Sequence, residues 1–129
     1  MSCKHSGRRT RRHVLPAGLG AFCEALAFLR DSNIDPTRPE VALDYWFDLF
    51  KVQAMQLVDL IAQEDFATSE ATLAVYLAAV RQWRSTMLEA GQRGSIMAAA
   101  QQNLEIADAA GYGTSSFAAQ MLTMSSRPE

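Results

Sequence analysis

Apolar and polar positions divide the chain into five amphipathic segments separated by turn residues. In each segment apolar residues recur every three to four positions, which is the spacing of one face of an α-helix. No segment between turn signals alternates with a period of two, so no strand is predicted. The pattern therefore predicts an all-α fold, a five-helix bundle.

The first helix is expected over Leu19–Ser32, ending where Asn33 and Pro36 supply turn residues. The second is expected from Arg38 to about Gln63, with Pro39 in its first turn, where the missing N–H is not needed. This second helix is long, roughly 39 Å at 1.5 Å per residue. It is expected to be the central helix of the bundle.

The long helix is apolar over most of its circumference, and its polar residues form one narrow stripe. A helix of this kind is packed by neighbours on several sides. We therefore expect it to be covered either by this chain or by a partner. Its apolar positions are Val41, Tyr45, Trp46, Leu49, Phe50, Val52, Leu57, Val58 and Ile61.

Three shorter helices are predicted to follow. Thr68 or Ser69 is expected to cap the third, which ends at Gly91 and Gly94. Its buried face is expected to comprise Leu73, Tyr76, Leu77, Val80, Trp83 and Met87.

Ser95 is expected to cap the fourth helix, and Gly111 to end it in a left-handed conformation. The inward residues of that helix are predicted to be Met97, Ala100, Leu104 and Ala107. A short last helix is expected after Thr114–Ser116, anchored by Phe117, Met121 and Leu122.

Charge sets the N-terminus apart. Five basic residues precede the first acidic residue, Glu24, and the remainder of the chain is acidic, which disfavours nucleic acid as a partner. We expect residues 1–17 to be a basic, disordered tail, residues 18–124 the helical domain, and residues 125–129 a frayed end. Two alternatives stay open for the tail: Thr10–Leu15 is similar to a twin-arginine export motif, or the stretch is foreign to the domain.

The compartment is predicted to be the cytoplasm, because two cysteines are too few for a disulfide framework. No membrane association is expected, because no apolar run approaches the roughly 18 residues of a spanning helix.

Few residues offer catalytic or ligand-binding chemistry. Both histidines, His5 and His13, lie in the tail, so the body lacks a histidine for a nucleophile–histidine pair. Together with Cys3 and Cys23 they match no usual zinc spacing, and no metal site is predicted. Gly18-Leu19-Gly20 lacks the third glycine and the preceding strand of a dinucleotide-binding motif. We therefore predict no catalytic residue in this chain and no cofactor bound by it alone.

Two stretches resemble the C-terminal helical domain of the imine reductases and reductive aminases, relatives of the β-hydroxyacid dehydrogenases. They are Asp65-Phe66-Ala67-Thr68-Ser69-Glu70-Ala71-Thr72-Leu73-Ala74-Val75-Tyr76-Leu77-Ala78-Ala79, and Ala107-Asp108-Ala109-Ala110-Gly111-Tyr112-Gly113 with Ser116-Phe117-Ala118-Ala119. The resemblance extends from about Leu19 to Met124. It implies a fold like the C-terminal domain of 6-phosphogluconate dehydrogenase.

In enzymes of that family an N-terminal Rossmann domain binds NADPH, a long helix joins it to the helical domain, and two chains exchange domains in a dimer. Hydride passes to a C=N carbon in an apolar pocket between the domains. The resemblance places Trp46 on one wall of this pocket and Val75 and Tyr76 on the opposite wall. Phe50, one turn beyond Trp46, is expected to extend the first wall.

The chain departs from the family in two respects. It carries no Rossmann domain, and the stretch that matches the family's proton-donor helix holds basic residues from Lys4 to Val14 instead of Asp, Glu or Tyr. Tyr76, with an ordinary pKa of about 10, is expected to be a pocket wall rather than a proton donor.

The resemblance therefore implies a dimerisation and substrate-pocket domain of an NADPH-dependent imine-reductase-like oxidoreductase, inactive alone. Its expected partner is a second copy or a separate nucleotide-binding domain, and the substrate of a complete enzyme is a small imine or amine. The alternative is a stand-alone helical self-association module without catalysis.

Overall fold

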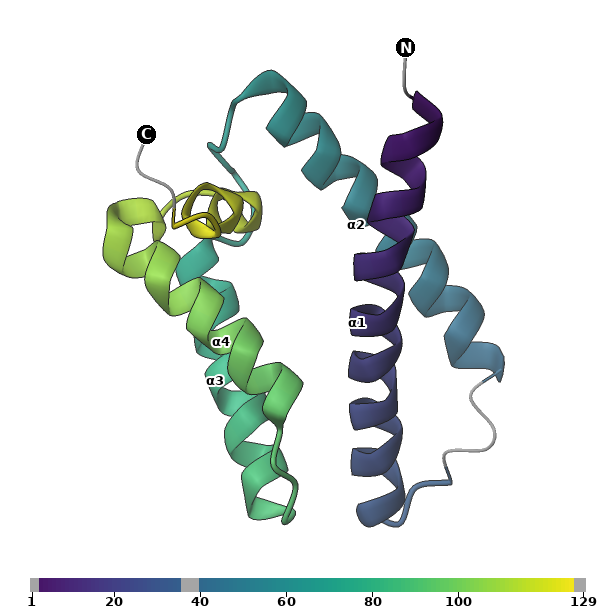
Figure 1. Cartoon of the computed structure of the whole chain (residues 1–129). Helices are drawn as coiled ribbons and strands as arrows, with labels where there is room; N and C mark the ends of the chain where they lie inside the picture. Colours follow the sequence, from purple (N-terminus) through teal and green to yellow (C-terminus); the bar gives the residue numbers. More distant parts are fainter. Residues whose placement is uncertain (1–2, 36–39, 127–129) are drawn as a thin grey trace.

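The computed structural model describes residues 3–35 and 40–126, with side chains for 14–35 and 43–126 (Figure 1). These residues form helices joined by turns, and no strand occurs among them. The predicted all-α class is confirmed. The elements are α1 (Cys3–Asp31), α2 (Glu40–Gln63), α3 (Leu73–Glu89), α4 (Ser95–Ala107), the π-helical turn η1 (Asp108–Tyr112) and the 3₁₀ helix η2 (Phe117–Thr123). Pro39 lies outside the described residues.

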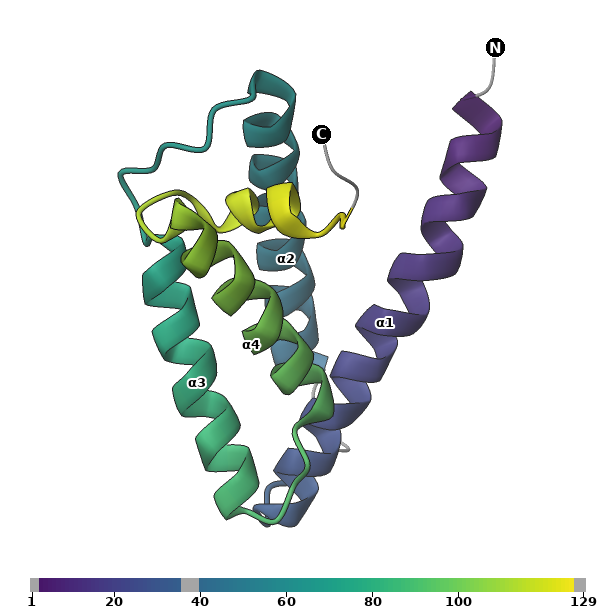
Figure 2. The same cartoon turned by 60° about the vertical axis from the view of Figure 1, so that its left-hand side comes forward.

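The core lies where α3, α4 and η2 meet. Figure 2 shows α3 and α4 side by side, with η2 crossing near one end of the pair. The buried cluster comprises Leu73, Leu77, Val80, Leu104, Ala107 and Ala119. Of the predicted buried face of α3, Leu73, Leu77, Val80 and Met87 are buried.

Trp83 was predicted to be buried, and this is wrong, because 56% of its surface is exposed. The buried residues of α3 follow a spacing of four and three, and that stripe continues from Val80 through the half-buried Arg84 to Met87. Trp83 lies one residue, or about 100°, away from this stripe. Periodicity alone allows either Trp83 or Arg84 to continue the buried stripe, and the packing of α3 against α4 buries Arg84.

The helix α1 begins at Cys3, sixteen residues before the predicted start at Leu19. Val14 to Leu19 are exposed, so this part of the helix packs no apolar face and carries no periodic signal in the sequence. The structure continues the helix across Gly18. The division at that point into a basic tail and a folded body stays a prediction.

The cap of α3 is Thr72 and not Thr68 or Ser69. The Thr72 hydroxyl accepts a hydrogen bond from the Val75 N–H at 3.4 Å, as an N-cap residue does. Thr68 instead accepts from the Glu70 N–H at 3.0 Å and closes a tight turn before the helix. Several Ser and Thr residues before α3 could act as its N-cap, and tertiary contacts determine which of them does.

At the C-terminal end, Ala118 and Ala119 are buried in place of the predicted anchors Met121 and Leu122, which are exposed. The reason is side-chain size: η2 contacts both α3 and α4, and alanine is small enough to permit that close approach. Phe117, the third predicted anchor, is half-buried and packs against the core.

Gly111 has φ +99°, which confirms its predicted left-handed conformation, although it lies inside η1 and α4 already ends at Ala107. A β-carbon added there meets no atom within 4 Å. We expect Gly111→Ala to lower the free energy of unfolding by about 1–2 kcal/mol through backbone strain alone. Gly18→Ala, inside α1 and also free of steric contact, should instead raise it by about 0.5–1 kcal/mol. Urea denaturation followed by circular dichroism measures both changes, and equal effects would contradict the expectation.

Candidate functional site

The two stretches that carry the family resemblance are joined in space, although residues 80–106 separate them in the sequence. The first N–H groups of α3 donate to carbonyl groups of the segment between η1 and η2, which satisfies helix-end donors that have no partner within the helix. These bonds run from Leu73 N to Ser115 O (2.8 Å) and from Ala74 N to Gly113 O (3.0 Å). In the opposite direction, Ser116 N donates to Phe66 O, before α3, at 2.7 Å.

Gly113 lies close to the Asp108 side chain of its own stretch and in contact with Ala74 of the other. A β-carbon at this position would overlap the carboxylate of Asp108 and would also touch Ala74. The Gly-Tyr-Gly turn thus brings its backbone close to the start of α3. Val75 and Tyr76 lie directly after this start.

Tyr76 is half-buried and packs against the core. Its ring lies 4.8 Å from that of Phe117, centroid to centroid, at an interplanar angle of 54°. This tilted arrangement is favourable for two aromatic rings and fixes the side chain. Val75, its neighbour, is exposed. Phe117 was predicted as a core residue, and its contact with Tyr76 could not be read from the sequence.

Trp46 and Phe50 lie one turn apart on α2, and both are exposed, Phe50 to 69%. Phe50 lines an open hollow of about 420 Å³ on the surface of α2, together with Lys51, Ala54, Met55, Val58 and Asp59. Trp46, Val75 and Tyr76 are not among its lining residues.

The structure brings Trp46 and Phe50 together on α2, and Val75 and Tyr76 together on α3. Both helices contact η2. Among the described residues of this chain, no contact joins Trp46 or Phe50 to Val75 or Tyr76. That the four residues line one pocket stays a prediction.

A second hollow, of about 320 Å³, lies between the end of α2 and the segment before α3. Its lining is largely polar: Gln56, Asp59, Leu60, Gln63, Ala67, Thr68, Ser69 and Glu70. No sequence pattern predicts this hollow, because it forms between two elements whose relative placement no local pattern encodes.

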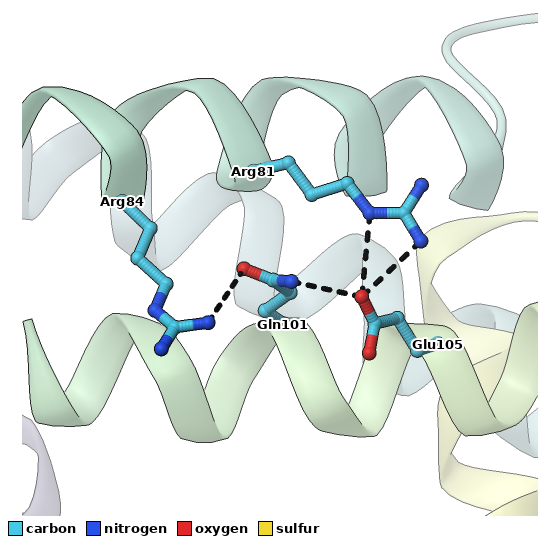
Figure 3. A network of polar contacts seen from close by, with 4 residues as sticks. All are labelled: Arg81, Arg84, Gln101 and Glu105. Carbon is cyan, nitrogen blue, oxygen red and sulfur yellow. Dashed lines mark hydrogen bonds and ion pairs between the residues drawn. The ribbon is translucent and has the colours of Figure 1, made fainter.

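A polar network ties α3 to α4 on the surface (Figure 3). Arg81 donates from Nε and Nη2 to one oxygen of Glu105, at 3.3 and 3.2 Å, and Gln101 donates to the same oxygen at 2.8 Å. Arg84 donates to Gln101 at 3.4 Å. The Gln101 hydrogen bond, followed by that of Arg81, lowers the pKa of Glu105 below its ordinary value. The network is therefore complete when Glu105 is ionised and weakens as the pH falls through that lowered pKa.

The Gly18-Leu19-Gly20 segment does not form a dinucleotide-binding loop. Gly18 and Gly20 lie inside α1 rather than in a loop between a strand and a helix, so their N–H groups do not form a cradle for a pyrophosphate.

Among the described side chains, no group of three or more His, Cys, Asp or Glu residues could hold a metal ion. Cys3, His5 and His13 lie outside the described side chains. Within the described part of the chain, no helix is both long and apolar enough to span a bilayer.

Comparison with protein families gives one match: the model of the NADPH-dependent reductive aminase-like C-terminal domain covers residues 13–126. Comparison with functionally curated proteins gives no match.

Several solved structures share the fold. An imine reductase from Bacillus cereus superposes with a TM-score of 0.86 at 14% identity, over 93% of this chain and 42% of its own. An imine reductase from Pseudomonas sp. gives 0.80 at 16% identity, over 84% of this chain and 38% of its own. A reductive aminase from Aspergillus terreus, in complex with NADPH and ethyl levulinate, gives 0.79 at 17% identity, over 86% and 39%. The chain thus spans about two fifths of the length of these proteins.

Proposed function

Because the chain belongs to the family of NADPH-dependent reductive aminase-like C-terminal domains, we propose that it is the helical half of an oxidoreductase acting on C=N bonds. In this proposal a nucleotide-binding domain holds NADPH, which supplies the hydride. This chain supplies apolar side chains that enclose a small imine, and a surface on which two copies associate. A cytoplasmic location belongs to the same proposal and is supported by the free, exposed thiol of Cys23.

The observation that carries the proposal is the unpartnered apolar surface of α2. Large apolar residues are exposed along most of its length. Exposed apolar surface on this scale marks an interaction site in a folded protein. The exposed apolar residues of α2 are referred to below as the α2 apolar surface: Tyr45, Trp46, Phe47, Leu49, Phe50, Val52, Met55 and Val58.

For the pocket itself we propose Trp46 and Phe50 on one wall and Val75 and Tyr76 on the other. The two pairs lie on different elements. In this proposal a second copy or a nucleotide domain brings the further side chains that complete the pocket. Apolar walls exclude water from the C=N bond, and the face of Trp46 attracts the positive charge of an iminium.

A chimera tests this proposal. Residues 13–126 would replace the C-terminal domain of the Bacillus cereus imine reductase, and NADPH oxidation would be followed with a cyclic imine. We expect turnover by the chimera and no NADPH fluorescence change with the chain alone. In the chimera, Trp46→Ala should raise KM for the imine about 10-fold or more through loss of a buried aromatic contact.

Trp83→Ala is the matched control, because it removes an equally large exposed side chain from α3, two turns beyond Tyr76. It should leave KM unchanged. Equal effects of the two substitutions would exclude Trp46 from the pocket.

A stand-alone self-association module is the second candidate, and the α2 apolar surface favours it equally. The two functions separate in the chimera. A folded chimera that dimerises but oxidises no NADPH supports the module and contradicts the oxidoreductase.

A further inference from the structure

The N-terminus of α4 lacks a capping side chain of its own. The residue at its N-cap position is Gly94, whose φ of 58° places it in the left-handed region. Glycine offers no oxygen to the unpaired N–H groups of the first turn. The sequence suggested that Ser95 would cap this helix, but Ser95 is already its first helical residue and makes no side-chain cap.

The missing cap comes from α1. The carboxylate of Glu24 accepts hydrogen bonds from the Ile96 N–H at 3.0 Å and from the Met97 N–H at 3.1 Å. These are the two positions that an N-cap side chain normally satisfies. The carboxylate also lies at the positive end of the α4 dipole, where a negative charge is stabilised. Glu24 thus performs a local capping role from 72 residues away.

A second polar contact lies seven residues further along α1. Asp31 accepts a hydrogen bond from the side-chain amide of Gln92, in the turn between α3 and α4. Residues seven apart lie on the same face of a helix, so Glu24 and Asp31 both face the turn and the start of α4. Between them Ala27 and Phe28 are half-buried.

Among the described side chains of α1, those nearest its N-terminus have no comparable attachment. Every described side chain from Val14 to Leu19 is exposed, and α4 is the helix against which α1 packs. Figure 2 shows α1 meeting the body near the α3–α4 turn and diverging from it toward the N-terminus. The direction of the helix is therefore set at its C-terminal half.

We propose that Glu24 is a positioning residue that latches α1 to α4, so that docking of α1 and formation of the first turn of α4 are one event. When α1 is undocked, the Ile96 and Met97 N–H groups lose their acceptors and this turn frays. When α1 is docked, its N-terminal half projects at a fixed angle. Use of that angle to orient a nucleotide-binding domain rests on the proposed function, whereas the latch is a property of this chain alone.

The test combines hydrogen exchange with a distance measurement on the chain without NADPH. In Glu24→Ala we expect amide exchange at Ile96 and Met97 to accelerate about 10- to 100-fold, because each N–H loses a hydrogen bond to a charged group. Glu24→Gln keeps one carbonyl acceptor without the charge and should give a smaller rise. Exchange at Leu104 should be unchanged, which distinguishes local fraying from global unfolding.

Spin labels on Gly18→Cys and Gln102→Cys, in a Cys3→Ser/Cys23→Ser background diluted with unlabelled chain, report the angle of α1. The distance distribution should be narrow with Glu24 present and should broaden in Glu24→Ala. Glu89→Gln, which neutralises an exposed carboxylate on α3, should leave both readouts unchanged. An unchanged distribution in Glu24→Ala, or equal broadening in Glu89→Gln, overturns the latch. Neither result depends on turnover by the chimera, so the latch and the proposed function fail separately.

Discussion

Replacing Leu104 with alanine is expected to lower the free energy of unfolding by about 2–5 kcal/mol. Leu104 is 1% exposed and lies in the cluster where α4 meets α3 and η2. The truncation removes buried methyl groups and leaves a cavity between helices that are held apart by their other contacts. The buried cluster is small, so the loss is a large fraction of the roughly 5–15 kcal/mol by which a domain is stable.

The matched control is Ile106→Ala, two residues further along α4 at an exposed position. It removes a similar side chain but creates no cavity, and surface changes usually stay within about 0.5 kcal/mol. Urea denaturation with circular dichroism provides both values. Equal destabilisation by the two substitutions would show that the core does not lie between α3, α4 and η2.

Introducing charge into the α2 apolar surface is expected to raise the dissociation constant of the dimer at least about 100-fold. The change is Phe50→Glu/Val58→Glu, which places two carboxylates in one hollow. An unpaired carboxylate loses hydration when a partner covers it, and a 100-fold change corresponds to only about 2.7 kcal/mol. Sedimentation equilibrium measures the constant.

The control for this double substitution is Ala99→Glu/Gln102→Glu, which adds two carboxylates to exposed positions of α4. It should leave the dissociation constant within about threefold of the parent value, apart from a weak charge repulsion screened by salt. A parent chain that is monomeric at micromolar concentration would refute self-association through α2, and with it the dimer of the proposed function.

The site was predictable only in part. Val75 and Tyr76 were assigned by resemblance to a short motif, and the structure adds that hydrogen bonds from Leu73 and Ala74 anchor this motif to the segment after η1. The stacking partner of Tyr76, Phe117, could not be found from spacing, because 41 residues separate them. Trp46 and Phe50 were assigned to a pocket wall, but no sequence signal fixes the angle between α2 and α3.

The sequence by itself determined the helical class, the left-handed conformation of Gly111, and most of the buried stripe of α3. These features depend on local backbone preference and on periodicity, which act over one or two turns. Only the tertiary structure decided that Arg84 rather than Trp83 continues that stripe, that Thr72 caps α3, and that Glu24 caps α4. Each of these depends on which helix packs beside which, and the hydrogen bonds of Glu24 join residues that are adjacent in space but 72 apart in the chain.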